Sequence, residues 1–295
     1  MNSNPATSIR EWFDQQVAQI PAHRTIEIDG RHIHVRTWDS PREAHIVLVH
    51  GGAANGAWWD PIAPSLRHLG HVHALDLGGQ GLSDWATDYS LDSWGHEVAE
   101  FVNDVAVADT PVVLIGHSRG GFVSLIASAR TSVPPRGLIL IESAFNVDPP
   151  PAKDVSHSPR APRSPLTRAE LVSRFRPLPH DIPSLDFVLQ HVAEQAVVER
   201  DGRWQWQLDK SFLGRVPAMR LEEAKSTDVP LVQIRGNHGL LDAHTAESAR
   251  QVIQPDSPIE IIEQAGHHIL LQKPRELAQR LAAHTAAFLS IDDGR

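Results

Sequence analysis

The sequence predicts an α/β fold: a doubly wound, mostly parallel sheet of eight strands, covered by helices and carrying an inserted cap subdomain. Short apolar runs of strand length alternate along the chain with segments of helical periodicity. This order is typical of an open sheet with helices on both faces. Several of the runs are apolar at every position, as expected for strands that are buried on both sides. The 295 residues suffice for one such domain with an insertion.

The predicted strands begin with a hairpin that turns at Asp29 and Gly30, a pair typical of two-residue turns. The two hairpin strands and six further strand-like runs cover residues 25–29, 32–38, 45–50, 71–76, 111–116, 137–142, 230–236 and 259–263. Helical patterns cover residues 59–69, 91–107, 121–130, 243–253 and 274–289. The last helix is predicted to begin at Pro274, because proline is favoured in the first turn.

Residues 144–228 interrupt the alternation. Nine prolines lie between residues 149 and 183, and no core strand is predicted there. We therefore predict a cap over residues 144–228, inserted into a core made of residues 1–143 and 229–295. The alternative is a poorly ordered loop, but the aromatic residues of this segment supply the apolar surface that a folded unit needs.

Three local patterns predict the structure of this cap. Thr167 and Glu170 have the spacing of a capping box, which predicts a short helix. Residues 184–198 favour a second helix. The stretch ERDGRWQWQLD then predicts a hairpin that places Trp204 and Trp206 on one face. We expect these two indoles to line a substrate pocket.

The composition restricts the function. A net charge of −9 argues against nucleic acid as a partner, because no basic stripe is offered to phosphates. Cysteine is absent, which excludes disulfides and thiolate chemistry and fits a reducing compartment. The stretch MNSNPATSIREWF lacks the apolar region of a signal peptide, and no apolar run approaches the roughly 20 residues of a membrane span. We expect a cytoplasmic monomer or homodimer without a membrane partner.

Eighteen histidines raise the question of a metal site. His32 and His34 share one face of a predicted strand, and so do His71 and His73. No third ligand lies at a familiar spacing, and there is no HExxH motif. We interpret these residues as surface or edge histidines and expect no metal.

The strongest motif is G-x-S-x-G, formed by Gly116, His117, Ser118, Arg119 and Gly120. An apolar strand precedes it and a helix follows, so the serine is predicted to lie on a strained turn that lifts its hydroxyl off the sheet. The residues two before and two after the serine must be small because they pack under the turn, and both are glycine. Ser118 is therefore the predicted nucleophile.

With this motif, the sequence resembles the α/β-hydrolase family over almost its whole length. HGGAANGAWWD is similar to the oxyanion loop of that family, and DLGGQGLSD matches its D-x-x-G-x-G-x-S turn. QAGHHILLQKP matches the G-H-x6-P segment that carries the catalytic histidine. In that register the histidine is His267, because Pro274 follows it by seven residues. The neighbouring His268 would be structural or line the pocket.

The resemblance implies a role for each of these groups. A serine hydroxyl is a weak nucleophile that needs an adjacent base. His267 would take its proton and then deliver it to the leaving group. The backbone N–H groups of Arg119 and Gly52 would stabilise the oxyanion, with Ala53 as the alternative to Gly52. No cofactor is implied.

The acid of the triad is less obvious. Most of the family carry it after the seventh strand, where this chain has Gly239. Asp242 follows three residues later, at a place suited to a helix N-cap. Some capped members, among them haloalkane dehalogenases and coelenterazine luciferases, keep a carboxylate after the sixth strand, where this chain has Glu142. A charge there needs a partner, which would be the histidine or a cap arginine such as Arg160 or Arg163. We expect Glu142 to be the acid.

The expected function is that of a serine hydrolase that cleaves a small, fairly apolar carboxylic ester or lactone through an acyl-enzyme. Dehalogenases and epoxide hydrolases of this family use an aspartate where this chain has Ser118, so the chain departs from both. Alternatives on the same scaffold are a carbon–carbon bond hydrolase of ring-fission products, a hydroxynitrile lyase, a perhydrolase, or a non-catalytic ligand receptor. The expected partner is a small-molecule ester.

Overall fold

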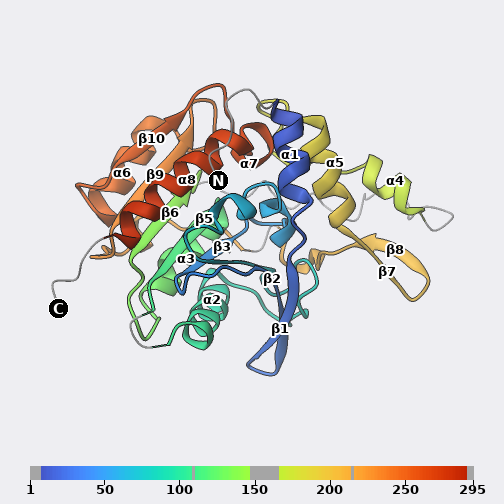
Figure 1. Ribbon diagram of the computed structural model, residues 1–295, viewed down its shortest axis with the longest axis horizontal. Coiled ribbons are helices and arrows are strands. Elements are labelled where there is room, and N and C mark those ends of the chain that lie inside the picture. Colours follow the sequence, from blue (N-terminus) through green and yellow to red (C-terminus); the bar gives the residue numbers. More distant parts are fainter. Residues whose placement is uncertain (1–7, 108–109, 147–165, 214–215, 291–295) are drawn as a thin grey trace.

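The chain forms one main sheet of eight strands, seen in a computed structural model that describes residues 8–107, 110–146, 166–213 and 216–290 (Figure 1). The strands are β1 (Ala22–Ile28), β2 (Arg31–Trp38), β3 (His45–Val49), β4 (His71–Leu75), β5 (Val112–His117), β6 (Gly137–Ile141), β9 (Leu231–Gly236) and β10 (Ile259–Ile262). Their order across the sheet is β1-β2-β4-β3-β5-β6-β9-β10. Strand β2 is antiparallel to both neighbours, and all other neighbouring pairs are parallel. The predicted α/β fold with a mostly parallel sheet of eight strands is confirmed.

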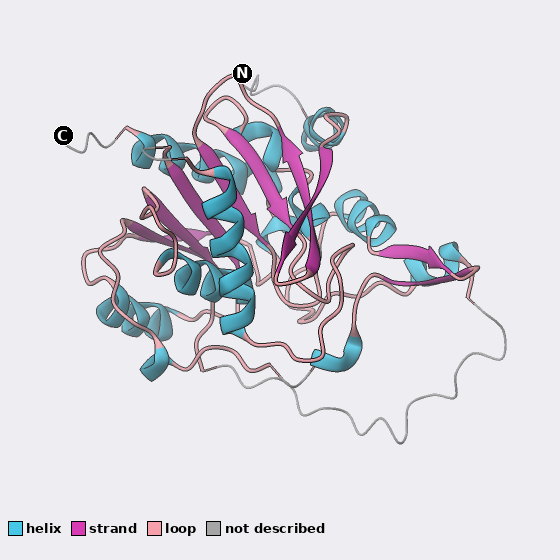
Figure 2. Cartoon of the chain, turned by 90° about the horizontal axis from the view of Figure 1, so that it is seen from below, coloured by secondary structure: helices cyan, strands magenta, loops and turns pink. Residues whose placement is uncertain are grey.

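Helices cover both faces of this sheet (Figure 2). The helices that pack on it are α1 (Ile9–Val17), α2 (Leu91–Val105), α3 (Arg119–Ser128), α6 (Ala243–Ile253) and α8 (Pro274–Leu289). Alternate residues of β5 enter two separate apolar clusters: Val113 and Ile115 pack with α1 and α8, whereas Val112 and Leu114 pack with α2, α3 and α6. This alternation follows from the two-residue repeat of a strand. It leaves the carboxyl ends of the parallel strands free to carry a site.

The prediction of an α-helix over residues 59–69 is wrong. Two short 3₁₀ helices form there instead, η1 (Gly56–Trp59) and η2 (Ala63–Leu66). Pro61 and Pro64 explain the difference, because proline lacks the N–H that continues an α-helix and collides with the preceding turn. Helix α1 was not predicted, although Ser8 and Glu11 form a capping box at its start.

Residues 166–213 form elements that lie beside the main sheet. They are α4 (Arg168–Ser173), α5 (Asp186–Gln195), β7 (Val197–Arg200), β8 (Arg203–Trp206) and η4 (Lys210–Phe212). The capping box of Thr167 and Glu170 is present, and β7 and β8 form the predicted hairpin. Figure 1 shows this hairpin and α4 at one end of the molecule, away from the main sheet. Residues 147–165 and 214–215 lie outside the described residues, so the boundaries of the cap stay a prediction.

Two of the four paired histidines are buried, which corrects their interpretation as surface or edge residues. His34 and His73 are 6% and 2% exposed. The reason is that neither strand lies at the edge of the sheet: β2, with His34, lies between β1 and β4, and β4, with His73, lies between β2 and β3. The His73 ring contacts His45, with His73 Nε2 and His45 Nδ1 3.0 Å apart. Within the described residues, no helix is both long and apolar enough to cross a membrane.

Candidate active site

Ser118 lies on the turn between β5 and α3, with a φ of 54° and a ψ of −121°. Two hydrogen bonds hold this unusual backbone: the Ser118 N–H donates to Ile141 O (2.7 Å), and the Ser143 hydroxyl donates to Ser118 O (2.9 Å). The flanking glycines are required by space, because a Cβ on Gly116 would lie 2.2 Å from Gly120 O. The strained turn presents the serine at the carboxyl edge of the sheet, where α/β folds bind ligands.

Glu142 lies at the same edge, directly after β6, and its side chain is fully buried. Its Oε2 atom lies 3.2 Å from Nδ1 of His267. Backbone N–H groups of Gly236 (2.8 Å), Leu240 (2.9 Å) and Leu241 (3.3 Å) also donate to the carboxylate. These donors offset the cost of burying the charge. The structure thus brings together the residues expected as acid and base, and their catalytic roles stay a prediction.

The space beside Gly239, where most of the family carry the acid, is filled by the Glu142 carboxylate. A Cβ on Gly239 would lie 2.1 Å from Glu142 Oε1. Asp242, the alternative acid, is exposed and serves as the N-cap of α6, where Oδ1 accepts a hydrogen bond from the Thr245 N–H (2.8 Å). That bond lowers the pKa of Asp242.

The alternative partners of Glu142, Arg160 and Arg163, lie outside the described residues. Among the described residues, the charged or titratable side chain that contacts the Glu142 carboxylate is His267.

Three buried imidazoles meet beside the serine turn: those of His117, His267 and His268. His117 Nε2 lies 2.9 Å from the His267 carbonyl oxygen, and the ring centroids of His267 and His268 are 5.1 Å apart. Burial lowers the pKa of His268 to about 4 and holds the pKa of His117 well below its usual range. Both rings are therefore neutral at pH 7. Of the neighbours His267 and His268, His267 contacts the Glu142 carboxylate, and its role as the base stays a prediction.

The loop after β3 carries the expected oxyanion donors. The Ala53 N–H already donates to Gln80 Oε1 (2.7 Å). Within the described residues, the backbone N–H groups of Gly52 and Arg119 donate to no protein acceptor. Both Gly52 and Ala53 are exposed. This arrangement favours Gly52 over Ala53 as the second donor, although the role itself stays a prediction.

The side chain of Arg119 also lies against this loop. A Cβ on Gly52 would meet Arg119 Nη1 at 2.2 Å, so a side chain at residue 52 would displace the guanidinium. The Arg119 Nη2 atom donates to Val216 O (2.9 Å), and the guanidinium lies 5.9 Å from the Trp94 ring. Burial lowers the pKa of Arg119. The guanidinium thus joins the turn that carries the serine to the segment around residue 216.

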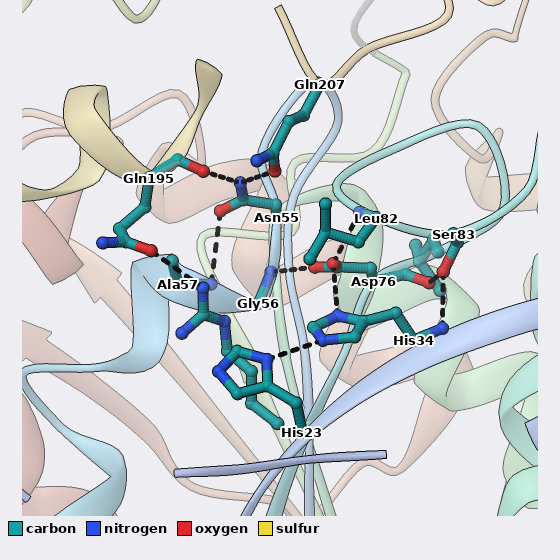
Figure 3. Close-up of polar contacts among 12 residues, drawn as sticks. His23, His34, Asn55, Gly56, Ala57, Asp76, Leu82, Ser83, Gln195 and Gln207 are labelled. Carbon is teal, nitrogen blue, oxygen red and sulfur yellow. Dashed lines mark hydrogen bonds and ion pairs between the residues drawn. The ribbon is translucent and has the colours of Figure 1, made fainter. Parts of the chain in front are cut away.

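Hydrogen bonds join the D-x-x-G-x-G-x-S turn, which begins at Asp76, to the oxyanion loop (Figure 3). The buried Asp76 carboxylate accepts hydrogen bonds from the N–H groups of Gly56 (2.6 Å) and Leu82 (2.9 Å), and His34 Nδ1 lies 2.7 Å from it. The Asn55 amide donates to Gln195 O (3.0 Å) at the end of α5. The turn therefore holds the loop, and Asn55 joins the loop to residues 166–213.

The expected pocket residues Trp204 and Trp206 pack against α4 and α5, in a small cluster of their own. Trp204 lies under the guanidinium of Arg168, 5.9 Å from ring centre to Cζ. Trp206 contacts Phe175 with ring centroids 5.8 Å apart, and Phe175 in turn contacts Trp58 at 6.4 Å. A packing role is therefore shown for both indoles, and a role in the pocket stays a prediction.

Trp58 was missed from the sequence as a site residue. Its ring meets that of His268 edge-on, with centroids 5.5 Å apart, and lies 6.4 Å from that of His117. The signal was present, because the HGGAANGAWWD stretch places two tryptophans directly after the oxyanion loop. Asp181 was also missed. Its Oδ2 accepts a hydrogen bond from the His267 N–H (2.5 Å).

The chain belongs to the alpha/beta hydrolase family, whose sequence profile matches residues 46–280. It is similar to Lipase LipV of Mycobacterium tuberculosis, with 27% identity over 179 residues, 60% of this chain and 66% of that protein. It is also similar to Methylesterase 2 of Arabidopsis thaliana, with 38% identity over 94 residues, 30% of this chain and 35% of that protein. Each match spans less than two thirds of the relative's length.

Solved structures share the fold. The thioesterase domain from the curacin biosynthetic pathway has a TM-score of 0.70 and 23% identity, covering 90% of this chain and 99% of that chain. At this identity the likeness concerns the fold alone.

Proposed function

We propose that the protein is a serine hydrolase that cleaves a small, fairly apolar carboxylic ester or lactone through an acyl-enzyme. The observation that carries the proposal is the 3.2 Å contact between the buried Glu142 carboxylate and His267 Nδ1, at the sheet edge where Ser118 occupies a strained turn. The names of the two relatives, a lipase and a methylesterase, support an ester as the substrate.

In the first half of the reaction, the Ser118 oxygen attacks the carbonyl carbon and its proton passes to Nε2 of His267. Glu142 holds the opposite nitrogen, Nδ1, and stabilises the imidazolium that results. The backbone N–H groups of Gly52 and Arg119 stabilise the oxyanion. When the tetrahedral intermediate collapses, the ester C–O bond breaks and the alcohol leaves with the proton from His267.

In the second half, water replaces the alcohol. His267 removes a proton from the water, which attacks the acyl carbon. The bond between that carbon and the Ser118 oxygen then breaks, and the proton on His267 passes to Ser118. For a lactone the alcohol stays joined to the acyl group, so the product is one hydroxy acid. Each step needs only water and groups of this chain.

The test is an activity screen of the full chain with chromogenic esters of graded acyl length and several lactones. We expect turnover of the shorter, apolar esters. Ser118→Ala and His267→Ala should each lower kcat by roughly 10³-fold or more, with little change in substrate binding. Ser128→Ala is the matched control, because its hydroxyl bonds to Leu125 O in the same helix and lies outside the site.

An undiminished rate in Ser118→Ala would exclude a serine mechanism. Binding of the esters without turnover by the unaltered chain would favour the ligand receptor instead. Cleavage of a ring-fission diketone, with no turnover of esters, would favour the carbon–carbon bond hydrolase.

A further inference from the structure

The imidazoles of His117, His267 and His268 lie within reach of a single ion. One nitrogen from each ring lies within 4.8 Å of the other two. The side chains come from the end of β5 and from the loop before α7 (Ile269–Gln272), and they are 2%, 5% and 6% exposed. The same sheet edge that carries the serine turn thus gathers three nitrogen donors.

Hydrogen bonds determine which nitrogen of two rings carries the lone pair. His117 Nε2 lies 2.9 Å from the His267 carbonyl oxygen. A carbonyl only accepts, so this nitrogen carries the proton and Nδ1 keeps the lone pair. By the same argument His267 Nδ1 donates to Glu142, 3.2 Å away, and Nε2 keeps the lone pair. Carbonyl and carboxylate acceptors of this kind are the usual second partners of metal-binding histidines.

The remaining nitrogens of His117 and His268 are buried without partners. Within the described residues, His117 Nδ1 and both ring nitrogens of His268 make no hydrogen bond, although the Leu178 carbonyl lies near the His268 ring. Buried polar atoms without partners are rare in native proteins, because leaving them unpaired is destabilising. A ligand bound to His117 Nδ1 and to the lone-pair nitrogen of His268 would remove part of this cost.

We propose that His117, His267 and His268 bind a divalent transition-metal ion, best fitted by zinc, and that the bound ion reversibly inhibits the hydrolase. Neutral imidazole is a good ligand for zinc, copper and nickel. Three histidines leave a fourth coordination position open, as in zinc sites with three protein ligands. The site is distinct in sequence from the histidine pairs at residues 32 to 34 and 71 to 73.

Inhibition rests on the proposed function, because the ion would use the His267 Nε2 lone pair that accepts the serine proton. A lone pair bonded to a metal cannot take that proton. The ion would also lie close to the nucleophile. A Cβ on Gly51 would be 3.1 Å from His117 Nδ1 and 3.3 Å from Ser118 Cβ. The His117 nitrogen and the serine side chain therefore both lie next to Gly51 of the oxyanion loop.

The binding test uses the full chain with Ser118→Ala, titrated with Co²⁺ and followed by visible absorption. We expect one equivalent of Co²⁺ with the intense band of four-coordinate cobalt, displaced by Zn²⁺ and abolished by EDTA. Adding His268→Phe should lower the affinity at least about tenfold, since loss of even an outer partner of a metal ligand costs about that much. The phenyl ring keeps the packing against Trp58, and circular dichroism checks the fold.

His71→Gln is the matched control, because His71 stacks on His45 at 5.4 Å in the other histidine cluster. Loss of Co²⁺ binding in His71→Gln, but not in His268→Phe, would overturn the proposed site. So would weak, six-coordinate binding that is equal in all variants, which would mean an adventitious surface ion only.

The inhibition test measures ester hydrolysis at increasing Zn²⁺, with each rate divided by the metal-free rate of the same variant. We expect EDTA to restore the rate, and His268→Phe to need at least about tenfold more Zn²⁺ for half inhibition. Binding at the site without inhibition would overturn the inhibitory role. If no ester is turned over, the proposed function fails, and the Co²⁺ titration still decides the metal site.

Discussion

At the scale of single residues, a carboxylate beside His267 can come from residue 142 or from residue 239, but the space does not hold both side chains. The Glu142 carboxylate fills the space that a side chain on residue 239 would enter. We predict that Glu142→Gln lowers kcat by roughly 10²- to 10⁴-fold, by analogy with other triad acids. The measurement is steady-state kinetics on the best ester of the screen. A near-normal rate in this variant would reassign the acid.

The same geometry predicts that the triad carboxylate can be moved from residue 142 to residue 239 by a double substitution. Glu142 has a φ of 50°, which glycine adopts without strain, whereas Gly239 has no positive φ. Glu142→Gly combined with Gly239→Asp should therefore regain at least about tenfold in kcat over Glu142→Gly alone, because the site then has a carboxylate from the usual position. Gly239→Asp alone is the control. It should be destabilised, because Glu142 still fills the space.

At the scale of elements, Asp242 belongs to the start of α6. Its carboxylate accepts a hydrogen bond from the Thr245 N–H and is exposed. We predict that Asp242→Ala lowers the free energy of unfolding by about 1 kcal/mol, as loss of a helix N-cap does. Its kcat should stay within about twofold of the parent. Urea unfolding and kinetics measure the two quantities. A hundredfold loss of kcat with normal stability would show that Asp242 acts in catalysis.

The histidines shared by β3 and β4 predict a pH dependence of stability. Burial lowers the pKa of His73 to about 3 and that of His45 to about 4, compared with 6.5 for an ordinary histidine. Below pH 6.5 the unfolded chain therefore binds protons that the folded chain does not. Stability should be unaffected by these groups above pH 6.5 and fall as the pH decreases from 6.5 to about 3.

The variant His73→Gln should make this decline shallower, by up to about 1.4 kcal/mol per pH unit. The measurement is urea unfolding at several pH values. His244→Gln, which changes an exposed histidine on α6, is the control and should keep the slope of the parent. An identical slope in His73→Gln would mean that His73 does not titrate between the two states.

At the scale of the whole molecule, a series of contacting aromatic rings joins residues 166–213 to the candidate site. Trp206 contacts Phe175, Phe175 contacts Trp58, and Trp58 contacts His268. We predict that Trp206→Ala changes the ratio of kcat/KM between long and short acyl esters by roughly fivefold or more, within the range that pocket shape controls. Trp204→Ala, on the same strand but packed under Arg168, is the control. Equal effects of both variants would show that the two indoles act only through packing.

The sequence by itself determined the features that depend on neighbouring residues. The strands were predicted to within one or two residues at most ends, because burial on both faces leaves continuous apolar runs. The strained turn at Ser118 was predictable, because the small residues it requires lie only two positions away. The prediction of a helix over residues 59–69 failed for an equally local reason. Its apolar residues have helical spacing, but two prolines prevent the hydrogen bonds of an α-helix.

Only the tertiary structure decided which distant residues meet. The Glu142 carboxylate accepts a hydrogen bond from the Leu240 N–H because β6 and β9 are neighbours in the sheet, and a pairing between strands about ninety residues apart leaves no local pattern. The meeting of His117 with His268 arises in the same way, between β5 and the loop before α7. The choice of Gly52 over Ala53 depended on the hydrogen bond that the Ala53 N–H donates to Gln80 Oε1. Local periodicity reports which face of an element is buried, whereas the order of the strands, set by packing of the whole chain, decides which side chains share a site.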